Sequence, residues 1–164
     1  MKKLMEAKSV KFKDWVFEVY REMTEQAYRN ILASGTETCG CTDCKNYIAY
    51  RDHVFPKEVI KLFADLGIDY RKEVEVTFWE TLSNGLLHIG GWHHFKGRVL
   101  TGKDYRISLP SGGHTIELTP ITDNFSIGFA EDNDLTLFGD KTGLVQVEFD
   151  TIIPWVIDEV AETA

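Results

Sequence analysis

The stretch VEVTFWETLSNGLLHIGGWHHF, residues 74–95, decides the fold. Asn84-Gly85 within it is a strong hairpin signal, because both central residues of a type I′ turn need positive φ angles. Apolar and polar residues alternate on either side of this pair, as they do in strands with one solvated face. The stretch therefore predicts two antiparallel strands joined by a two-residue loop.

A two-residue loop fixes which residues of the two strands face each other. Counting outward from Asn84-Gly85 puts Val76 opposite His93 and Glu75 opposite His94. This register gives one apolar face, and a shift by one residue would destroy it. We therefore expect His93 to point into the core and His94 to point outward. The expected pairs on the polar face are Thr81–His88, Glu75–His94 and Glu73–Lys96.

Four side chains on the outward face form a candidate ligand-binding platform. They are Trp79, His88, Trp92 and His94. Such a group of rings resembles a stacking surface for a sugar, a base or an aromatic side chain, since clustered exposed apolar groups are often functional. The alternative is cross-strand aromatic packing, with Gly90 kept small so that Trp79 can lie over it.

Two polar residues on the inward face need their own explanation. His93, between apolar neighbours, is typical of a core histidine with a hydrogen-bond partner. Glu80 is either a carboxylate exposed at the sheet rim, which we favour, or a buried acid with a raised pKa. A close Glu80–His93 pair in a pocket would favour an enzyme, but the expected register separates the two residues.

The hydrophobic period changes near residue 71. Before it, apolar residues recur at three- and four-residue spacing and predict about three helices, with Gly35 ending the first and Gly67 capping the third. After it, the period is two, which predicts strands. The expected helices are 12–31, 42–53 and 56–66, and the expected strands include 74–78, 105–109, 116–118, 125–129, 135–137 and 145–149.

These patterns predict one domain of the α+β class. Residues 1–70 would form a helical layer, and residues 71–164 would form an antiparallel sheet half. We expect the N-terminal helices to pack on the apolar face of a curled antiparallel sheet or barrel-like meander.

All three cysteines lie within CGCTDC, residues 39–44. Three thiolates can surround one Zn²⁺, with Gly40 easing the turn between them, which gives the candidate metal ligands Cys39, Cys41 and Cys44. A fourth ligand is missing locally, because His53 projects from the opposite side of the helix that follows. His93 or His114, from the sheet half, would have to supply it.

Two other interpretations of the cysteines remain open. Cys41 and Cys44 form a C-x-x-C motif at a helix start, where the helix dipole favours a redox-active thiolate, although Asp43 opposes it. Cys41, Cys44 and Ile48 also share one helical face, so reduced cysteines can simply fill the core. Zinc is thus the one cofactor that the sequence suggests.

Charge and composition narrow the range of partners. The chain has 18 basic and 26 acidic residues, and its whole net charge of −8 lies in residues 71–164. Such a chain repels phosphate backbones, and no stretch approaches the ~18–20 apolar residues of a membrane span, so we expect neither nucleic acid nor a membrane as partner. The lack of an apolar signal-peptide core and the odd cysteine number favour a cytoplasmic protein.

The segments CGCTDCKNY, FP before a helix, GGWHHFKG, and VQVEF followed by IPW resemble the pattern of a bacterial family of uncharacterised proteins. The resemblance covers residues 39–157 and implies no activity, cofactor or substrate. The chain has no phosphate-binding loop, nucleophile elbow or His-Glu-x-x-His motif. We therefore expect a non-catalytic binding or interaction protein whose partner is a protein or a small ligand. The alternative is an enzyme, either a thiol redox protein or a small hydrolase using Glu80 and a histidine.

Overall fold

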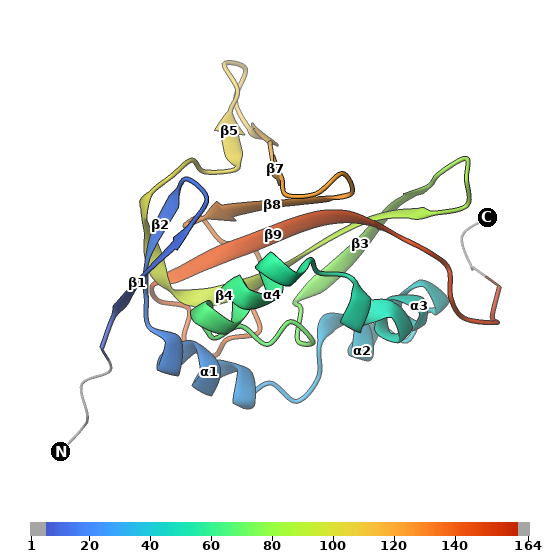
Figure 1. Ribbon diagram of the computed structural model, residues 1–164, viewed down its shortest axis with the longest axis horizontal. Coiled ribbons are helices and arrows are strands. Elements are labelled where there is room, and N and C mark those ends of the chain that lie inside the picture. The colour runs from blue at the N-terminus through green and yellow to red at the C-terminus, as the bar shows by residue number, and fades with distance from the viewer. Residues whose placement is uncertain (1–5, 161–164) are drawn as a thin grey trace.

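The computed structural model describes residues 6–160 and shows an α+β fold (Figure 1). The helices are α1 (Arg21–Arg29), α2 (Gly35–Cys39), α3 (Thr42–Tyr50), the 3₁₀ turn η1 (Arg51–His53) and α4 (Lys57–Leu66). The strands are β1 (Lys8–Phe12), β2 (Trp15–Val19), β3 (Glu75–Thr81), β4 (Leu87–Thr101), β5 (Arg106–Ser108), β6 (His114–Ile116), β7 (Thr119–Pro120), β8 (Phe125–Ala130) and β9 (Leu144–Ile153). Seven strands form one antiparallel sheet in the order β1-β2-β4-β9-β8-β7, with β3 also paired to β4. The sheet is not closed into a barrel, so the curled open form is the correct one of the two expected.

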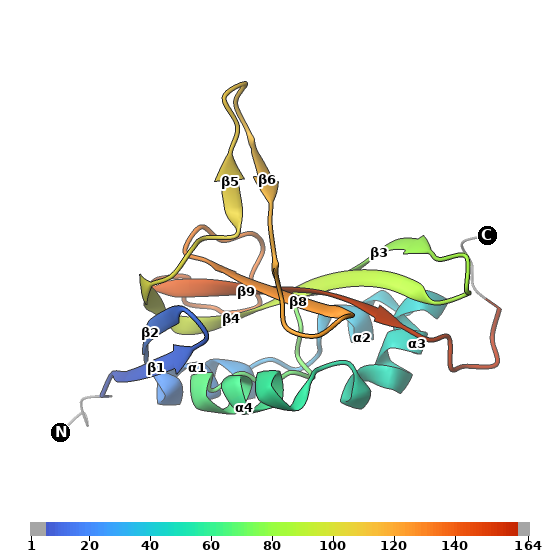
Figure 2. The same ribbon diagram turned by 45° about the horizontal axis from the view of Figure 1, so that its top comes forward.

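The helices cover one face of the sheet, and the β5–β6 hairpin stands on the other (Figure 2). We call these the helix face and the outer face. The core lies between the helices and the helix face, where Phe55 of the helical layer packs on Phe125 and Phe149. None of the helices within residues 6–160 has the length and apolarity needed to cross a bilayer.

Two of the three expected helices are confirmed. The segment 42–53 forms α3 and η1, and the segment 56–66 forms α4. Gly67 caps α4 in the left-handed conformation (φ 83°), and the N–H of Ile68 then donates to the carbonyl of Phe63 (2.9 Å). This is the six-to-one bond that a glycine in the left-handed region makes possible at a helix end.

The expected helix over residues 12–31 is wrong in its first half. The chain instead forms the β1–β2 hairpin, turning at Lys13 with φ 52°, and α1 begins only at Arg21. Phe17 of β2 pairs with Val99 on the edge of β4. Apolar residues here fit both a helical and an alternating period, and the available sheet edge favours the strand, since propensity yields to tertiary pairing. The first 70 residues therefore hold strands as well as helices.

Asn84-Gly85 closes the β3–β4 hairpin, but the expected register is wrong, by one residue at Glu80 and Thr81 and by two residues over 75–78. Gly85 has positive φ (84°) and Asn84 does not, so the loop has three residues, and the N–H of Leu82 donates to the carbonyl of Leu86 (2.7 Å). A bulge at Trp79 adds a second residue to β3. Val76 consequently faces Gly91, and Glu75 faces Trp92. Because the shift over residues 75–78 is even, the residues of β4 that they meet keep their expected faces. The odd shift beyond the bulge moves Glu80 from its expected inward face to the face of His88, so that expectation is wrong.

The strands β2 and β3 pair with different parts of the same edge of β4 and leave a gap between them. Side chains of α1 fill this gap. The N–H of Lys96 donates to the hydroxyl of Thr24 (2.8 Å). The hydroxyl of Tyr28 donates to the carbonyl of His94 (2.8 Å) and accepts from its N–H (3.2 Å). These contacts satisfy backbone groups that would otherwise lack partners in the interior, and so they fix α1 against the sheet.

The expected strand over residues 135–137 is wrong. This segment belongs to the loop between β8 and β9, which covers part of the outer face. The backbone N–H of Asp134 donates to the side chain of Gln146 (2.8 Å), and the indole of Trp92 donates to the carbonyl of Leu135 (2.9 Å). Hydrogen bonds with side chains of the sheet thus hold this loop in place of backbone pairing with a strand.

Candidate functional site

The three cysteines lie at the corner where α2 ends and α3 begins. Cys39 is the last residue of α2, and Gly40 follows it in the left-handed conformation (φ 74°). A Cβ on Gly40 would meet nothing within 4 Å, so the backbone angle rather than space favours glycine here. Cys41 is the N-cap of α3, and its Sγ accepts a hydrogen bond from the N–H of Cys44 (3.4 Å).

The three sulfurs converge on one point of the corner. The Sγ atoms of Cys39, Cys41 and Cys44 all lie within 4.8 Å of one another, so the cluster could bind a metal ion. Zn–S bonds of ~2.3 Å in a tetrahedral site put sulfurs roughly 3.8 Å apart, which a small movement of the thiols would reach. An iron–sulfur cluster in which each thiolate binds a different iron spreads its sulfurs farther. The spacing therefore fits a single ion.

The protonation of Cys44 follows from its position. Its side chain is buried, whereas that of Cys39 is exposed. Burial, followed by hydrogen bonds with Cys41 and Cys39, raises the pKa of the Cys44 thiol above its ordinary value. Without a cation nearby, Cys44 stays a thiol at neutral pH, and a metal would have to displace its proton. The raised pKa also argues against Cys44 as a reactive thiolate in a redox pair.

The corner is tied to the end of β9 through Asn46. This side chain is fully buried. Its amide donates to the carbonyl of Pro154 (3.1 Å), and its oxygen accepts from the N–H of Val156 (2.7 Å). An ion pair between Lys45 and Glu159 (3.3 Å) adds a further link. The CGCTDCKN and IPW segments, remote in sequence, therefore meet at one place.

No expected histidine reaches the cysteines to complete a zinc site. Within residues 6–160, no fourth His, Cys, Asp or Glu joins the group. His53 lies exposed in η1, His93 lies in the core, and His114 lies exposed on β6. The expectation that His93 or His114 supplies a ligand is therefore wrong. An ion held by the three thiolates would keep one coordination position for a ligand from outside the group.

The expected platform on the outer face is only partly assembled. Trp79 is 56% exposed and lies over Gly90, as the packing interpretation predicts: a Cβ on Gly90 would stand 2.9 Å from the indole nitrogen. His88 is half-buried beside it, whereas the indole of Trp92 is engaged by the 131–143 loop. His94 points outward but is fully buried, and its Nε2 lies 3.2 Å from the side-chain oxygen of Gln146. His94 is therefore not available to a ligand.

His88 is held between two carboxylates. Its Nε2 lies 2.5 Å from Oδ1 of Asp150, and its Nδ1 lies 3.9 Å from Oε1 of Glu80. Glu80 is exposed at the sheet rim, as we favoured, and it lies beside His88 rather than His93. Ser126 of β8 pairs with Asp150 of β9 on the edge opposite to β4, which carries His88, so Asp150 lies on the strand between the serine and the histidine. A hydrolase triad needs the imidazole between the other two groups, so this arrangement does not support one.

His93 is the core histidine that the alternation predicts. It is fully buried, and its ring packs on those of Phe55 and Phe63. Its Nε2 donates to the carbonyl of Tyr70 (3.0 Å), and its Nδ1 is buried with no hydrogen-bond partner among residues 6–160. Burial lowers the pKa of His93 to about 4, so the ring is neutral at pH 7.

Sequence reasoning placed Glu73 on the polar face opposite Lys96, and the structure buries it completely. Its carboxylate accepts hydrogen bonds from the N–H and the hydroxyl of Thr36, and it lies 3.9 Å from the guanidinium of Arg51. Burial raises the pKa of Glu73 above its ordinary value. Its partners are remote in sequence, so no local pattern could have identified this network.

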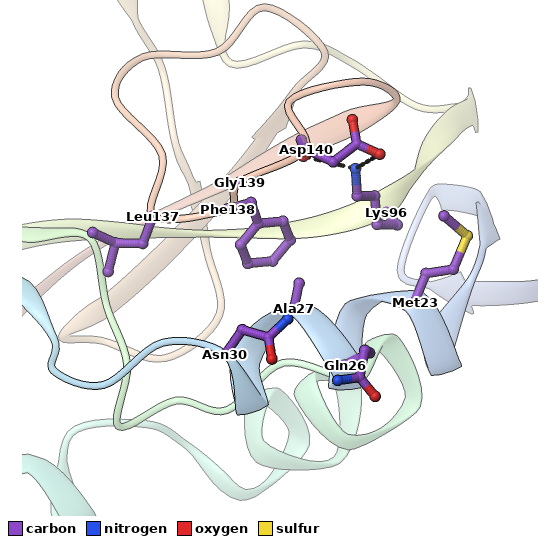
Figure 3. A pocket seen from close by; sticks show the side chains of 9 residues that line it. All are labelled: Met23, Gln26, Ala27, Asn30, Lys96, Leu137, Phe138, Gly139 and Asp140. Carbon is purple, nitrogen blue, oxygen red and sulfur yellow. Dashed lines mark hydrogen bonds and ion pairs between the residues drawn. The ribbon is translucent and has the colours of Figure 1, made fainter.

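A hollow of about 540 Å³ lies between α1 and the 131–143 loop (Figure 3). At its edge, the ammonium of Lys96 donates to the carbonyls of Asp140 (2.8 Å) and Thr142 (2.9 Å) and pairs with the Asp140 carboxylate (3.2 Å). Its charge is thus already compensated within the protein. The lining residues are Met23, Gln26, Ala27, Asn30, Lys96, Leu137, Phe138, Gly139 and Asp140. This set offers packing surface and amides but no group poised for reaction.

Comparison with known proteins gives no match: no protein family, curated protein or solved structure is significantly similar to the chain. The class of protein is therefore defined by its geometry. It is an α+β protein with a three-thiol corner at one end of an open antiparallel sheet.

Proposed function

We propose that the protein binds one Zn²⁺ ion through the thiolates of Cys39, Cys41 and Cys44. The convergence of the three Sγ atoms within 4.8 Å carries this proposal. It arises from local features that act together, namely the end of α2, the left-handed Gly40 and the N-cap at Cys41. Thiolates are the ligands that Zn²⁺ prefers in structural sites.

The metal would brace the helical corner rather than catalyse a reaction. It would join the last turn of α2 to the first turn of α3, next to the buried Asn46 that holds the 154–156 segment. Water or a small anion would occupy the fourth position. A hydrolytic zinc site needs a general base near the metal-bound water, and the described part of the chain places no histidine or further acid within the sulfur group. The protein is then a non-catalytic binding protein with a structural metal.

Metal titration tests the site directly. Protein purified without chelators or affinity metal is expected to carry about one Zn²⁺ per chain by native mass spectrometry. Each of Cys39→Ser, Cys41→Ser and Cys44→Ser should weaken zinc binding by at least about 100-fold in a chelator competition, because a neutral hydroxyl replaces a charged thiolate. Chelation of the parent protein should also lower its melting temperature, since metal binding is coupled to folding.

Two variants serve as controls for that titration. Asp43→Asn changes a charge inside the motif, and His53→Gln removes the histidine nearest in sequence, and both should keep the zinc stoichiometry. A stoichiometry near zero, with a Cys44 thiol that reacts with a thiol reagent only after unfolding, would contradict the proposal and favour core packing. In that case Cys44→Ala should cost only about 1 kcal/mol of stability through lost packing. Ready formation of a Cys41–Cys44 disulfide without zinc binding would instead favour the redox interpretation.

A further inference from the structure

A groove of about 480 Å³ lies on the outer face of the sheet, on the side where the β5–β6 hairpin stands (Figure 2). It shares no lining residue with the cysteine corner or with the hollow beside α1. Trp79 lies over Gly90 of β4 and Leu118 over Gly128 of β8, with β9 between these two strands. Trp79 and His88 therefore form one side of the groove, and Ile116 and Leu118 form the other. The floor comes from the central strands: Gly90, Ser126, Glu148, Phe149 and Asp150.

The sides of the groove are exposed and apolar. Trp79 is 56% exposed and Ile116 is 51% exposed, although both are large apolar residues. The bulge in β3 presents Trp79 to the groove, and Gly90 provides the space beneath its ring. Two such residues on opposite sides of one groove can hold a flat or aliphatic group between them, which a single exposed apolar residue cannot.

The floor of the groove is acidic. Glu148 and Asp150 are two residues apart on β9 and therefore point to the same face. Among residues 6–160, no Lys or Arg lines the groove, and His88, which lies 2.5 Å from Asp150, is its one basic group. The nearby guanidinium of Arg106 is engaged by Asp132 (3.1 Å) and Asp134 (2.7 Å).

Glu148 lacks a full counter-charge in the part of the chain that the structure describes. Its side chain is half-buried, and burial raises the pKa of its carboxyl group above the ordinary value. Hydrogen bonding to Tyr105 and the charge of Arg106 oppose this effect only in part. A cation in the groove would favour the ionised form of Glu148, whereas an anion would be repelled by both carboxylates.

We propose that this groove binds a small organic cation, with a primary ammonium or a guanidinium on an apolar body. The cationic group would lie on the floor between Glu148 and Asp150. The apolar body would lie between Trp79 and Ile116, where it packs against the indole ring. The net negative charge of residues 71–164 favours such a ligand over phosphates and carboxylates. This site is independent of the zinc site proposed above.

Benzylamine and benzyl alcohol are suitable probes, because they share one apolar body and differ in the charge of the head group. Binding is followed by the indole N–H signals in ¹H–¹⁵N NMR spectra, with the Trp79 signal identified through Trp79→Phe. We expect benzylamine to shift the Trp79 signal and to bind at least about tenfold more tightly than the alcohol. Added salt should weaken binding of the amine and leave binding of the alcohol unchanged, since only the amine interacts with charges.

Variants assign the effect to residues of the groove. Glu148→Gln should weaken binding of benzylamine by at least about tenfold, corresponding to about 1.4 kcal/mol. Trp79→Ala, in which binding is followed through the backbone amide signal of Gly90, should weaken binding of both probes. Trp79 is exposed, so its replacement tests the groove even if Glu148→Gln fails to fold. Glu75→Gln is the matched control, because Glu75 is an exposed carboxylate of β3 outside the groove, and its affinity should stay unchanged.

Three outcomes would overturn the proposal. Equal affinity for benzylamine and benzyl alcohol would show a merely apolar groove. Binding of methyl β-glucoside in preference to benzylamine would make the site a saccharide site. No response of Trp79 to any probe up to about 10 mM would mean that the groove is not a ligand site. Cys39→Ser should keep its affinity for benzylamine, so that failure of the zinc proposal and failure of this one can be told apart.

Discussion

Gly35→Ala is expected to lower the free energy of unfolding by about 3 kcal/mol or more, because it forces backbone atoms apart. Gly35 opens α2, and its N–H donates to the carbonyl of Glu73 (3.0 Å). A Cβ at this position would stand 1.9 Å from the carbonyl oxygen and 2.7 Å from the carbonyl carbon of Val74. Neither atom can rotate away as a side chain could, so α2 would have to separate from β3.

Urea denaturation at neutral pH checks this expectation. Gly139→Ala is the matched control, since a Cβ there meets nothing within 4 Å and Gly139 does not have positive φ. The control should stay within about 0.5 kcal/mol of the parent protein. Equal unfolding midpoints for the two variants would contradict the close approach of α2 and β3. Gly35→Ala should also weaken zinc binding, because α2 carries Cys39.

Acid is expected to remove about 3 kcal/mol of stability through His93 alone. The pKa of this residue is about 4 in the folded protein, against an ordinary value of 6.5. Between these values the unfolded chain binds a proton that the folded protein does not, so stability rises with pH. The contribution is complete above about pH 6.5, falls as the pH drops towards 4, and is absent below that. A difference of ~2.5 units at 1.36 kcal/mol each gives the magnitude.

His93→Leu tests that contribution, because leucine fills a similar volume and does not titrate. The variant loses the hydrogen bond to Tyr70 at every pH. Between pH 6.5 and 4, its unfolding should take up about one proton less than unfolding of the parent protein, so its free energy of unfolding should fall less steeply as the pH drops. His114→Gln, which replaces an exposed histidine of β6, is the matched control.

Other buried groups also contribute to the pH dependence of stability, both in the parent protein and in His93→Leu. His94 has a lowered pKa, also about 4, and adds to the acid sensitivity. The raised pKa values of Glu73 and Glu148 act in the opposite direction, because these carboxyls bind protons more readily in the folded state. These contributions cancel when the variant is compared with the parent protein. An unchanged pH dependence in His93→Leu would show that His93 is not the buried neutral base described above.

Much of the fold follows from local signals in the sequence. The α+β class, α3, α4 and the glycine cap at Gly67 were all predictable, since period and capping chemistry act within a few residues. The inward position of His93 and the packing of Trp79 over Gly90 also followed, because strand alternation survives an even shift in register. The gathering of the cysteines was readable too, since one left-handed glycine and one N-cap bring the three thiols together.

Side-chain partners remote in sequence were not predictable. Gln146, Glu148 and Asp150 alternate with apolar residues in the sequence, and this pattern was a signal for the polar face of β9. Which of them would meet His88 depended on the pairing of β4 with β9. Trp92 and His94 lie where the alternation places them, but the 131–143 loop engages the indole of the half-buried Trp92, and His94 is fully buried beside Phe138 of that loop.

The sequence by itself determined the class of fold, the two later helices, the hairpin at Gly85 and the three-cysteine corner. Each depends on φ preferences or hydrophobic spacing within a short stretch of chain. Only the tertiary structure decided that residues 8–19 form strands, that β3 carries a bulge at Trp79, and that His94 is covered. In these cases the local pattern fits more than one conformation, and the choice comes from pairing with the edge of β4 and from packing against segments far away in the chain.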